Sequence, residues 1–148
     1  MNDQPPKIFE LFNEIGIINQ LSVALFNRLM PDGLHVSHFS VLNHLVRLGD
    51  GKTPLAIAQA FQITKGTMTH TLSVLERRGL IRLEANPHDK RSKLVFLTDE
   101  GRGFRNNAIQ GLAPAAQKLS RKIDMEGLIA ILPELTKLRK VLDENRDL

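Results

Sequence analysis

A segment beginning at Thr53 changes its hydrophobic period twice, and this constrains the fold more than any other feature of the chain. Thr53 followed by Pro54 predicts a helix start, because threonine caps a first turn and proline suits the first helical position. The helical pattern breaks at residues 62–64, resumes after Thr64 as the expected N-cap, and ends at Gly79. The apolar positions are Leu55, Ala58 and Phe61 in the first helix and Met68, Leu72 and Leu75 in the second. Two helices joined by about three residues form a helix-turn-helix.

The pattern after Gly79 predicts a β-hairpin. Residues 80–85 and 91–97 are expected strands, and Asn86–Lys90 between them is rich in turn-forming residues. A hairpin that follows a helix-turn-helix is the wing of a winged helix. We therefore expect a mainly α protein with a small β-hairpin wing, a recognition helix at about 64–78 and the wing at about 81–97.

The outer face of the second predicted helix carries small or hydrogen-bonding side chains. An ordinary solvent face would more often carry Glu and Lys pairs that support the helix. Glycine and threonine are poor helix formers, so another demand sets this choice. Close approach to a DNA major groove is such a demand. The predicted DNA-binding residues of this helix are Lys65, Gly66, Thr67, Thr69, His70, Ser73 and Arg77. The alternative is that the threonines only cap the helix.

The net positive charge of the chain lies in one segment. The net charge is +4, from 20 basic and 16 acidic residues. Residues 62–93 hold seven of the basic and three of the acidic residues, which leaves 13 of each elsewhere. Such a concentration is expected of a polyanion-binding site, although a solvated surface gives the same pattern.

Long apolar helices flank the basic segment. Residues 6–30 and the stretch after Thr98, a predicted N-cap, carry leucine and isoleucine at helical spacing. Pro114 is expected to kink the helix after Thr98, Asp124 to cap the last helix, and Pro133 to interrupt it. Self-association through these helices would bury their excess apolar surface and bring together two DNA-binding winged helices, called reading heads below. Packing within one chain is the alternative.

We accordingly divide the chain into three parts. Residues 1–34 are an expected dimerisation helix, 35–98 the DNA-binding winged helix-turn-helix, and 99–148 the C-terminal linker and dimerisation helices. The second helix of the chain is expected to begin at Ser37 as N-cap and to end at Gly49.

Several classes of protein are unsupported by the sequence. Cysteine is absent, which excludes disulfides, cysteine nucleophiles and cysteine-ligated metals. No P-loop, dinucleotide fingerprint, zinc-protease motif or nucleophile elbow is present, so we expect no enzyme and no cofactor. No apolar run reaches the roughly 20 residues of a membrane span, so we expect a cytoplasmic protein with no membrane partner.

The stretch from Leu34 to Gly101 resembles the MarR family of winged-helix transcription regulators. The matching segments, in order, are Thr53–Ala58 in the first reader helix, Ile63–Thr69 at the start of the recognition helix, Leu75–Ile81 at its end, and Asp89-Lys90-Arg91 ahead of Leu97-Thr98 and Glu100-Gly101. The resemblance implies a homodimer that binds a pseudo-palindromic double-stranded DNA operator. It also implies a cytoplasmic transcriptional regulator, which we expect to be a repressor released by a small aromatic or anionic effector.

The resemblance also assigns residues in the wing. Lys90 and Arg91 match DNA-contacting positions, and Asp89 matches the carboxylate that holds the wing or Arg91 in position. Two residues depart from the family pattern. His70 and Leu83 stand where many members carry arginine, which weakens the expected contact at both positions.

A small-molecule pocket and a metal site are the remaining possibilities that the resemblance raises. The candidate pocket residues are Phe12, Ile15, His38, Phe39 and Phe104, for which plain core packing is the alternative. His35, His38 and His44 lie close in sequence, but residues 99–116 add no histidine, so we assign no metal site.

The rival function is a winged helix that binds another protein without a DNA site. Steep salt dependence would separate DNA binding from that alternative.

Overall fold

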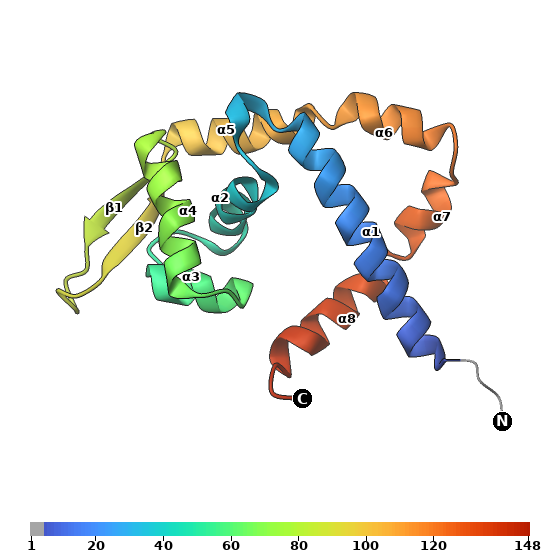
Figure 1. The fold of residues 1–148 in the computed structure, drawn as a ribbon, viewed down its shortest axis with the longest axis horizontal. Coiled ribbons are helices and arrows are strands. Elements are labelled where there is room, and N and C mark those ends of the chain that lie inside the picture. The colour runs from blue at the N-terminus through green and yellow to red at the C-terminus, as the bar shows by residue number, and fades with distance from the viewer. Residues whose placement is uncertain (1–4) are drawn as a thin grey trace. The chain divides into compact units, whose positions relative to one another are not determined.

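The computed structural model describes residues 5–148 of the chain. These residues belong to two compact units, which divide between Leu112 and Ala113. The first unit holds α1 (Lys7–Leu29), a 3-10 turn (Pro31–Gly33), α2 (Val36–Leu48), α3 (Pro54–Phe61), α4 (Lys65–Arg77), β1 (Ile81–Ala85), β2 (Lys93–Leu97) and α5 (Asp99–Gln110). The second unit holds α6 (Ala113–Ser120), α7 (Met125–Ala130) and α8 (Leu132–Glu144). The order of elements in the first unit is that of a winged helix, and Figure 1 labels them.

Four helices begin at the N-caps that the sequence predicts. The side chains of Thr53, Thr64 and Thr98 accept backbone N–H groups at the starts of α3, α4 and α5. Asp124 does the same for α7. Each side chain satisfies an N–H group that has no partner inside its own helix.

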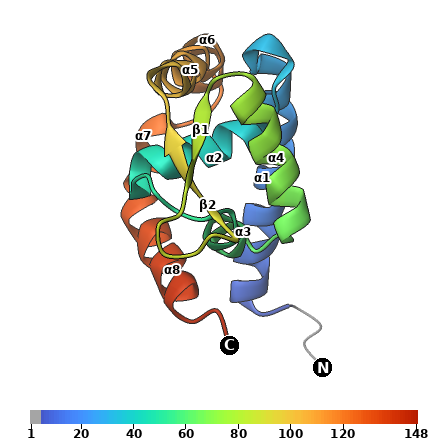
Figure 2. The same ribbon diagram turned by 90° about the vertical axis from the view of Figure 1, so that its left-hand side faces the viewer.

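The wing is a two-stranded antiparallel hairpin. β1 pairs with β2 from Ile81–Leu97 to Ala85–Lys93. β1 lies next to α4 (Figure 2), and β2 lies next to α2 and α3. Lys52 adds an isolated antiparallel bridge to Val95, and the Asp50 side chain accepts the Leu97 N–H at 2.9 Å. The segment at residues 50–52 therefore also holds β2 in place.

The core of the first unit joins α2, α3, α4 and the hairpin. Its buried apolar residues are Leu34, Val41, Leu42, Leu45, Ile57, Ala58, Met68, Leu72, Leu75, Leu80, Ile81, Val95 and Leu97. The three predicted core positions of α4 are confirmed. The prediction for α3 is wrong at Leu55, which is 48% exposed, while Ile57 is fully buried. Ala58 is buried and Phe61 packs against the core as predicted, so the face includes Ile57 in place of Leu55.

Close approach of two backbones fixes the start of α5. The Thr98 hydroxyl donates to the Gly79 carbonyl at 2.6 Å, and the Thr98 N–H donates to the Leu80 carbonyl at 3.2 Å. A Cβ atom at Gly101 would collide with the Leu80 carbonyl oxygen. Gly79 itself has a φ of 70°, the left-handed conformation expected from its place after α4.

Two predicted boundaries are wrong. α2 begins two residues earlier than expected, because His35 is its N-cap and Ser37 lies inside the helix. The helix after Thr98 does not continue through Pro114 with a kink. It ends at Gln110, and Pro114 lies in the first turn of the separate helix α6. The predicted interruption near Pro133 is confirmed, since α7 and α8 are distinct.

Helix α1 exposes most of its apolar side chains. None of its 23 residues is buried. The exposed apolar residues of α1 are Ile8, Phe9, Leu11, Phe12, Ile17, Ile18, Leu21 and Leu29. By length and composition alone α1 could cross a membrane, with a mean hydropathy of 1.2 over its most apolar window. The expectation that no apolar stretch approaches this length is therefore too strict. Polar residues such as Gln20 lie opposite the apolar stripe, a pattern typical of a helix with one covered face.

Candidate nucleic-acid interface

Helix α4 presents a polar outer face opposite its core face. Met68, Thr71, Leu72 and Leu75 are its buried residues. All seven residues predicted to contact DNA from this helix are exposed. The inner stripe at positions 68, 72 and 75 thus fixes which side chains face outward.

The threonines of α4 divide into two groups. The Thr64 hydroxyl caps the helix by accepting the Thr67 N–H and donates to the Thr67 hydroxyl at 2.8 Å. The buried Thr71 hydroxyl donates to the Thr67 carbonyl. The N-cap interaction therefore accounts for Thr64 and Thr67, and packing accounts for Thr71. Thr69 and Ser73 are exposed, and among the described residues their hydroxyls have no hydrogen-bond partner. These two hydroxyls remain open to an external molecule.

The tip of the wing is held together by Asp89. Its carboxylate accepts the Arg91 backbone N–H at 2.9 Å and the Arg91 Nε at 3.2 Å. These hydrogen bonds hold the pKa of the Asp89 carboxyl below its usual value. The Asn86 side chain accepts the His88 N–H and donates to the Ser92 hydroxyl. The Arg91 side chain stays 92% exposed, so the guanidinium is oriented without being buried.

A groove of about 650 Å³ lies between the two helices of the helix-turn-helix and the wing. It brings together three of the predicted DNA-binding residues, Lys65, Thr69 and Arg91, together with Asp89. The remaining lining residues are Thr53, Pro54, Leu55, Leu83, Asn86, Ser92 and Lys93. The start of α4 and the wing tip therefore form one continuous surface. The other predicted DNA-binding residues, which are Gly66, Thr67, His70, Ser73, Arg77 and Lys90, lie outside the groove lining.

Lys93 is a groove residue that was absent from the predicted site. Its place two residues after Arg91, at the start of a strand that alternates in exposure, is the signal that could have identified it. Leu83 is partly buried and packs against the core at the groove wall, which explains an apolar residue at this position of the wing.

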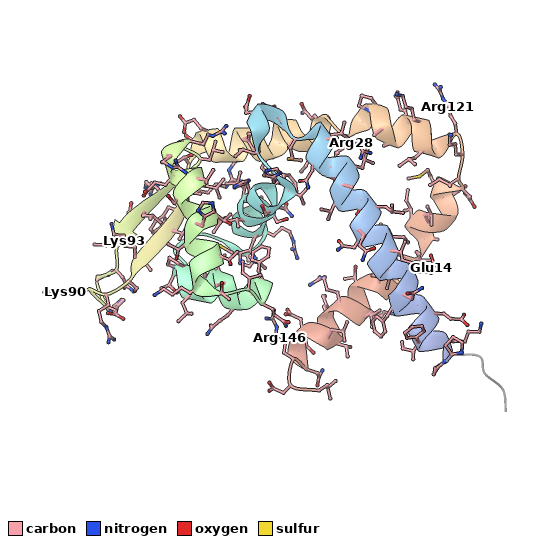
Figure 3. The ribbon with its side chains drawn as sticks, viewed as in Figure 1. Glu14, Arg28, Lys90, Lys93, Arg121 and Arg146 are labelled. Carbon is pink, nitrogen blue, oxygen red and sulfur yellow. The ribbon has the colours of Figure 1, made fainter. Side chains whose placement is uncertain are left out.

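The basic residues of segment 62–93 differ in their partners. Arg82 bonds to Glu84 at 2.9 Å and lies over the Phe96 ring, and Arg78 bonds to the Asp32 carbonyl. Lys65 and the wing lysines Lys90 and Lys93 are exposed, and none has an ion pair within residues 5–148. The two wing lysines extend from the hairpin in Figure 3. Within residues 62–93, the lysines without an ion pair therefore lie at the start of α4 and on the wing.

The predicted pocket residues are not gathered by any feature that the structure describes. Phe104 packs against the core and Phe39 is half-buried, as plain core residues would be. Phe12 is exposed and Ile15 is half-buried on α1. The effector pocket stays a prediction.

The histidines near α2 have neighbours other than a metal. The buried His38 accepts the His35 backbone N–H through Nδ1 at 3.0 Å, and the two rings are 5.9 Å apart. Burial lowers the pKa of His38, and the nearby His35 and Arg78 lower it further. The His44 ring contacts Phe61, and burial lowers its pKa as well. Among residues 5–148 no cluster of His, Asp or Glu has the geometry of a metal site.

Comparison with known proteins shows which family the chain is similar to. Residues 32–92 match the family model described as MarR family. Over 90 residues the chain is 32% identical to the transcriptional regulator HosA of Escherichia coli O111:H-. That match covers 61% of this chain, and the chain spans 65% of the length of this relative. These matches agree with the predicted resemblance to the MarR family, and the regulatory activity of this chain stays a prediction.

Solved structures agree with the fold. Wild-type MarR from Escherichia coli in its apo form superposes with a TM-score of 0.76 at 24% identity, over 93% of this chain and 98% of that one. BldR from Sulfolobus solfataricus superposes with a TM-score of 0.70 at 22% identity, over 88% of this chain and 95% of that one. A mutant Escherichia coli MarR complexed with operator DNA superposes with a TM-score of 0.68 at 25% identity, over 89% of this chain and 95% of that one. The helix-turn-helix, the wing and the match over residues 32–92 together show that the chain has a winged-helix fold similar to that of the MarR family.

Proposed function

We propose that this protein is a homodimeric transcriptional regulator that binds a double-stranded DNA operator. In this proposal α4 enters a major groove and the wing tip reaches the adjacent minor groove. The observation that carries the proposal is the groove that Thr69 and Arg91 share, with exposed lysines around it. The similarity to a MarR protein complexed with operator DNA supports it.

The chemistry of the surface suits each part of a duplex. Thr69, His70 and Ser73 carry short donors and acceptors suited to base edges, and a threonine methyl suits a thymine methyl. The cations Lys65, Arg77 and Lys90 are suited to phosphates. The remaining predicted contacts, Gly66 and Thr67, are uncharged and exposed at the start of α4, where a phosphate could approach the backbone. The guanidinium of Arg91 suits the negative potential of a narrow minor groove. Asp89 orients Arg91 and makes no contact with the DNA backbone itself, since like charges repel.

Exposed apolar surface supports the homodimer. α1 leaves eight large apolar side chains exposed, and the second unit exposes Leu119, Ile123, Leu128, Ile129, Ile131, Leu132, Val141 and Leu142. Surface of this kind marks an interaction site. A second copy of the chain would cover it and would pair two reading heads about a two-fold axis.

The regulation that we propose rests on the similarity to the MarR family. The protein represses transcription until a small aromatic or anionic effector binds near Phe12, Ile15, His38, Phe39 and Phe104, and it works in the cytoplasm. A thermal-shift screen with salicylate-like carboxylates tests this part: stabilisation that disappears in Phe104→Ala and is matched by release of DNA supports it. Stabilisation without release, or no stabilisation, contradicts it.

Selection of bound duplexes from a random DNA pool tests the central proposal. The expected result is a pair of inverted half-sites whose centres lie about one helical turn apart, 10–10.5 base pairs. The affinity for the selected duplex should fall log-linearly with salt. A pool that yields no enriched sequence, together with salt-insensitive capture of a protein partner, favours the alternative of a protein-binding winged helix.

A further inference from the structure

Two adjacent arginines at the end of α4 have different partners. The Nε of Arg77 lies 3.4 Å from the Ser73 carbonyl, one turn back on the same helix. Nη1 of Arg78 donates to the Asp32 carbonyl at 2.6 Å, across 46 positions of sequence. The sequence presents both as members of one basic segment, but their side chains leave the helix toward different parts of the unit.

The acceptor of the Arg78 bond lies in a turn of restricted shape. Asp32 and Gly33 both have left-handed backbone conformations, with φ of 60° and 70°. The next residue, Leu34, is buried in the core. On the far side of the turn, the Asn27 side chain of α1 accepts the Val36 N–H at 2.8 Å. The turn between α1 and α2 is thus anchored on both sides of the carbonyl that it presents to Arg78.

The Arg78 bond consequently ties the end of α4 to the end of α1. α4 carries the DNA-binding face, and α1 carries the exposed apolar stripe that a second copy would cover. Arg78 is absent from the groove lining, and its guanidinium already has an acceptor within the chain. The Arg78 guanidinium is therefore better placed to hold α4 in position than to bind a DNA phosphate.

We propose that Arg78 is a positioning residue that holds the recognition helix on the α1–α2 turn and thereby fixes the separation of the two reading heads in the dimer. The inference rests on the proposed function. A dimer gains affinity from its second head only when both heads meet their half-sites at once. Loss of the Arg78 bond therefore weakens binding to two half-sites while each head still reads its own.

The experiment compares Arg78→Gln with Arg77→Gln on two DNA probes. The probes are the duplex selected from the random pool and a shortened duplex that carries one of its half-sites. For Arg78→Gln we expect roughly a tenfold loss of affinity for the full duplex, with unchanged affinity for the half-site duplex and an unchanged salt slope. For Arg77→Gln, the matched charge loss one residue earlier, we expect weaker binding to both probes and a salt slope smaller by about one.

Other results overturn the inference. An equal loss on both probes identifies a phosphate contact or a general loss of folded protein, and unchanged binding to both identifies no role. Arg78→Lys keeps a donor for the Asp32 carbonyl and should recover most of the full-duplex affinity, which guards against misfolding of the glutamine variant. A wild-type protein that enriches no duplex overturns the proposed function, whereas an Arg78→Gln profile that matches Arg77→Gln overturns only this inference.

Discussion

Helices α4 and α1 both have an outer face that the rest of the chain does not bury, but the two faces differ in chemistry. The outer face of α4 combines small polar side chains with lysine and arginine, while its inner face is fully packed. α1 has no buried residue and exposes isoleucine, leucine and phenylalanine. An exposed polar, cationic face suits a hydrated polyanion, and an exposed apolar stripe suits a protein surface. The contrast supports the proposal that α4 binds DNA and that α1 binds a second chain.

The largest effect is expected from a charge in the apolar stripe of α1. Ile18→Glu places a carboxylate where the partner would cover a side chain that is now 60% exposed. An uncompensated buried charge costs about 3–5 kcal/mol, so the dimer should dissociate at micromolar concentration. Sedimentation velocity measures the mass.

The matched control is Gln20→Glu on the opposite side of α1. It adds the same charge with almost no change in size and should leave the dimer intact. If Ile18→Glu remains dimeric, or if both variants dissociate alike, the assignment of the apolar stripe to the dimer is wrong.

The next effect concerns the wing tip. Arg91→Ala should weaken binding to the selected duplex by about 1–3 kcal/mol, because the oriented guanidinium is removed from the groove that α4 and the wing share. Arg121→Ala removes the same charge from the second unit and serves as the control. Fluorescence anisotropy at fixed salt measures both, and equal affinities for Arg91→Ala and wild type would remove the wing from the interface.

The third prediction tests the packing of α5 against the residue that precedes β1. Gly101→Ala should destabilise the protein by roughly 1–3 kcal/mol, because the added methyl meets the Leu80 carbonyl at the base of the wing. Gly103→Ala, on the same helix with open space around its Cβ position, should stabilise it by up to about 1 kcal/mol. Urea unfolding measures the pair, and a neutral Gly101→Ala would refute the close approach of α5 to β1.

The smallest expected effect is the pH dependence of stability. The folded-state pKa of His38 and that of His44 are lowered, chiefly by burial, so the unfolded chain binds protons more readily. Stability should therefore be complete above pH 6.5 and fall as the pH drops below it toward the folded-state pKa. His38→Gln should reduce the slope of the unfolding free energy between pH 7 and 5.5. An unchanged slope would show that His38 is not responsible.

The success of sequence-based prediction differs between local and distant features. The N-caps at Thr53, Thr64 and Thr98 were predictable, because a cap is decided by residues within one turn. The core face of α4 was predictable from the spacing of Met68 and Leu72. In α3 the same spacing favoured Leu55, because eight residues are too few to distinguish neighbouring stripes.

Features that join distant residues could not be predicted. Asp50 holds the wing through Leu97, and Arg78 reaches Asp32, although nothing near these residues in sequence indicates the partner. The groove required the tertiary placement of the hairpin beside α4, which brings Lys93 toward Thr69. The helical spacing predicts that His70 and the threonines of α4 face outward together. Only the structure shows that Thr64 and Thr67 bond to each other while the Thr69 hydroxyl stays open.

Mapping the backbone amides that change on adding the selected duplex tests the contrast between α4 and α1 most directly. Amide chemical shifts of the deuterated wild-type dimer should change within residues 64–77 and 86–93 and stay constant along residues 7–29. Changes concentrated in α1, with α4 and the wing tip unaffected, would contradict the assignment of the two faces.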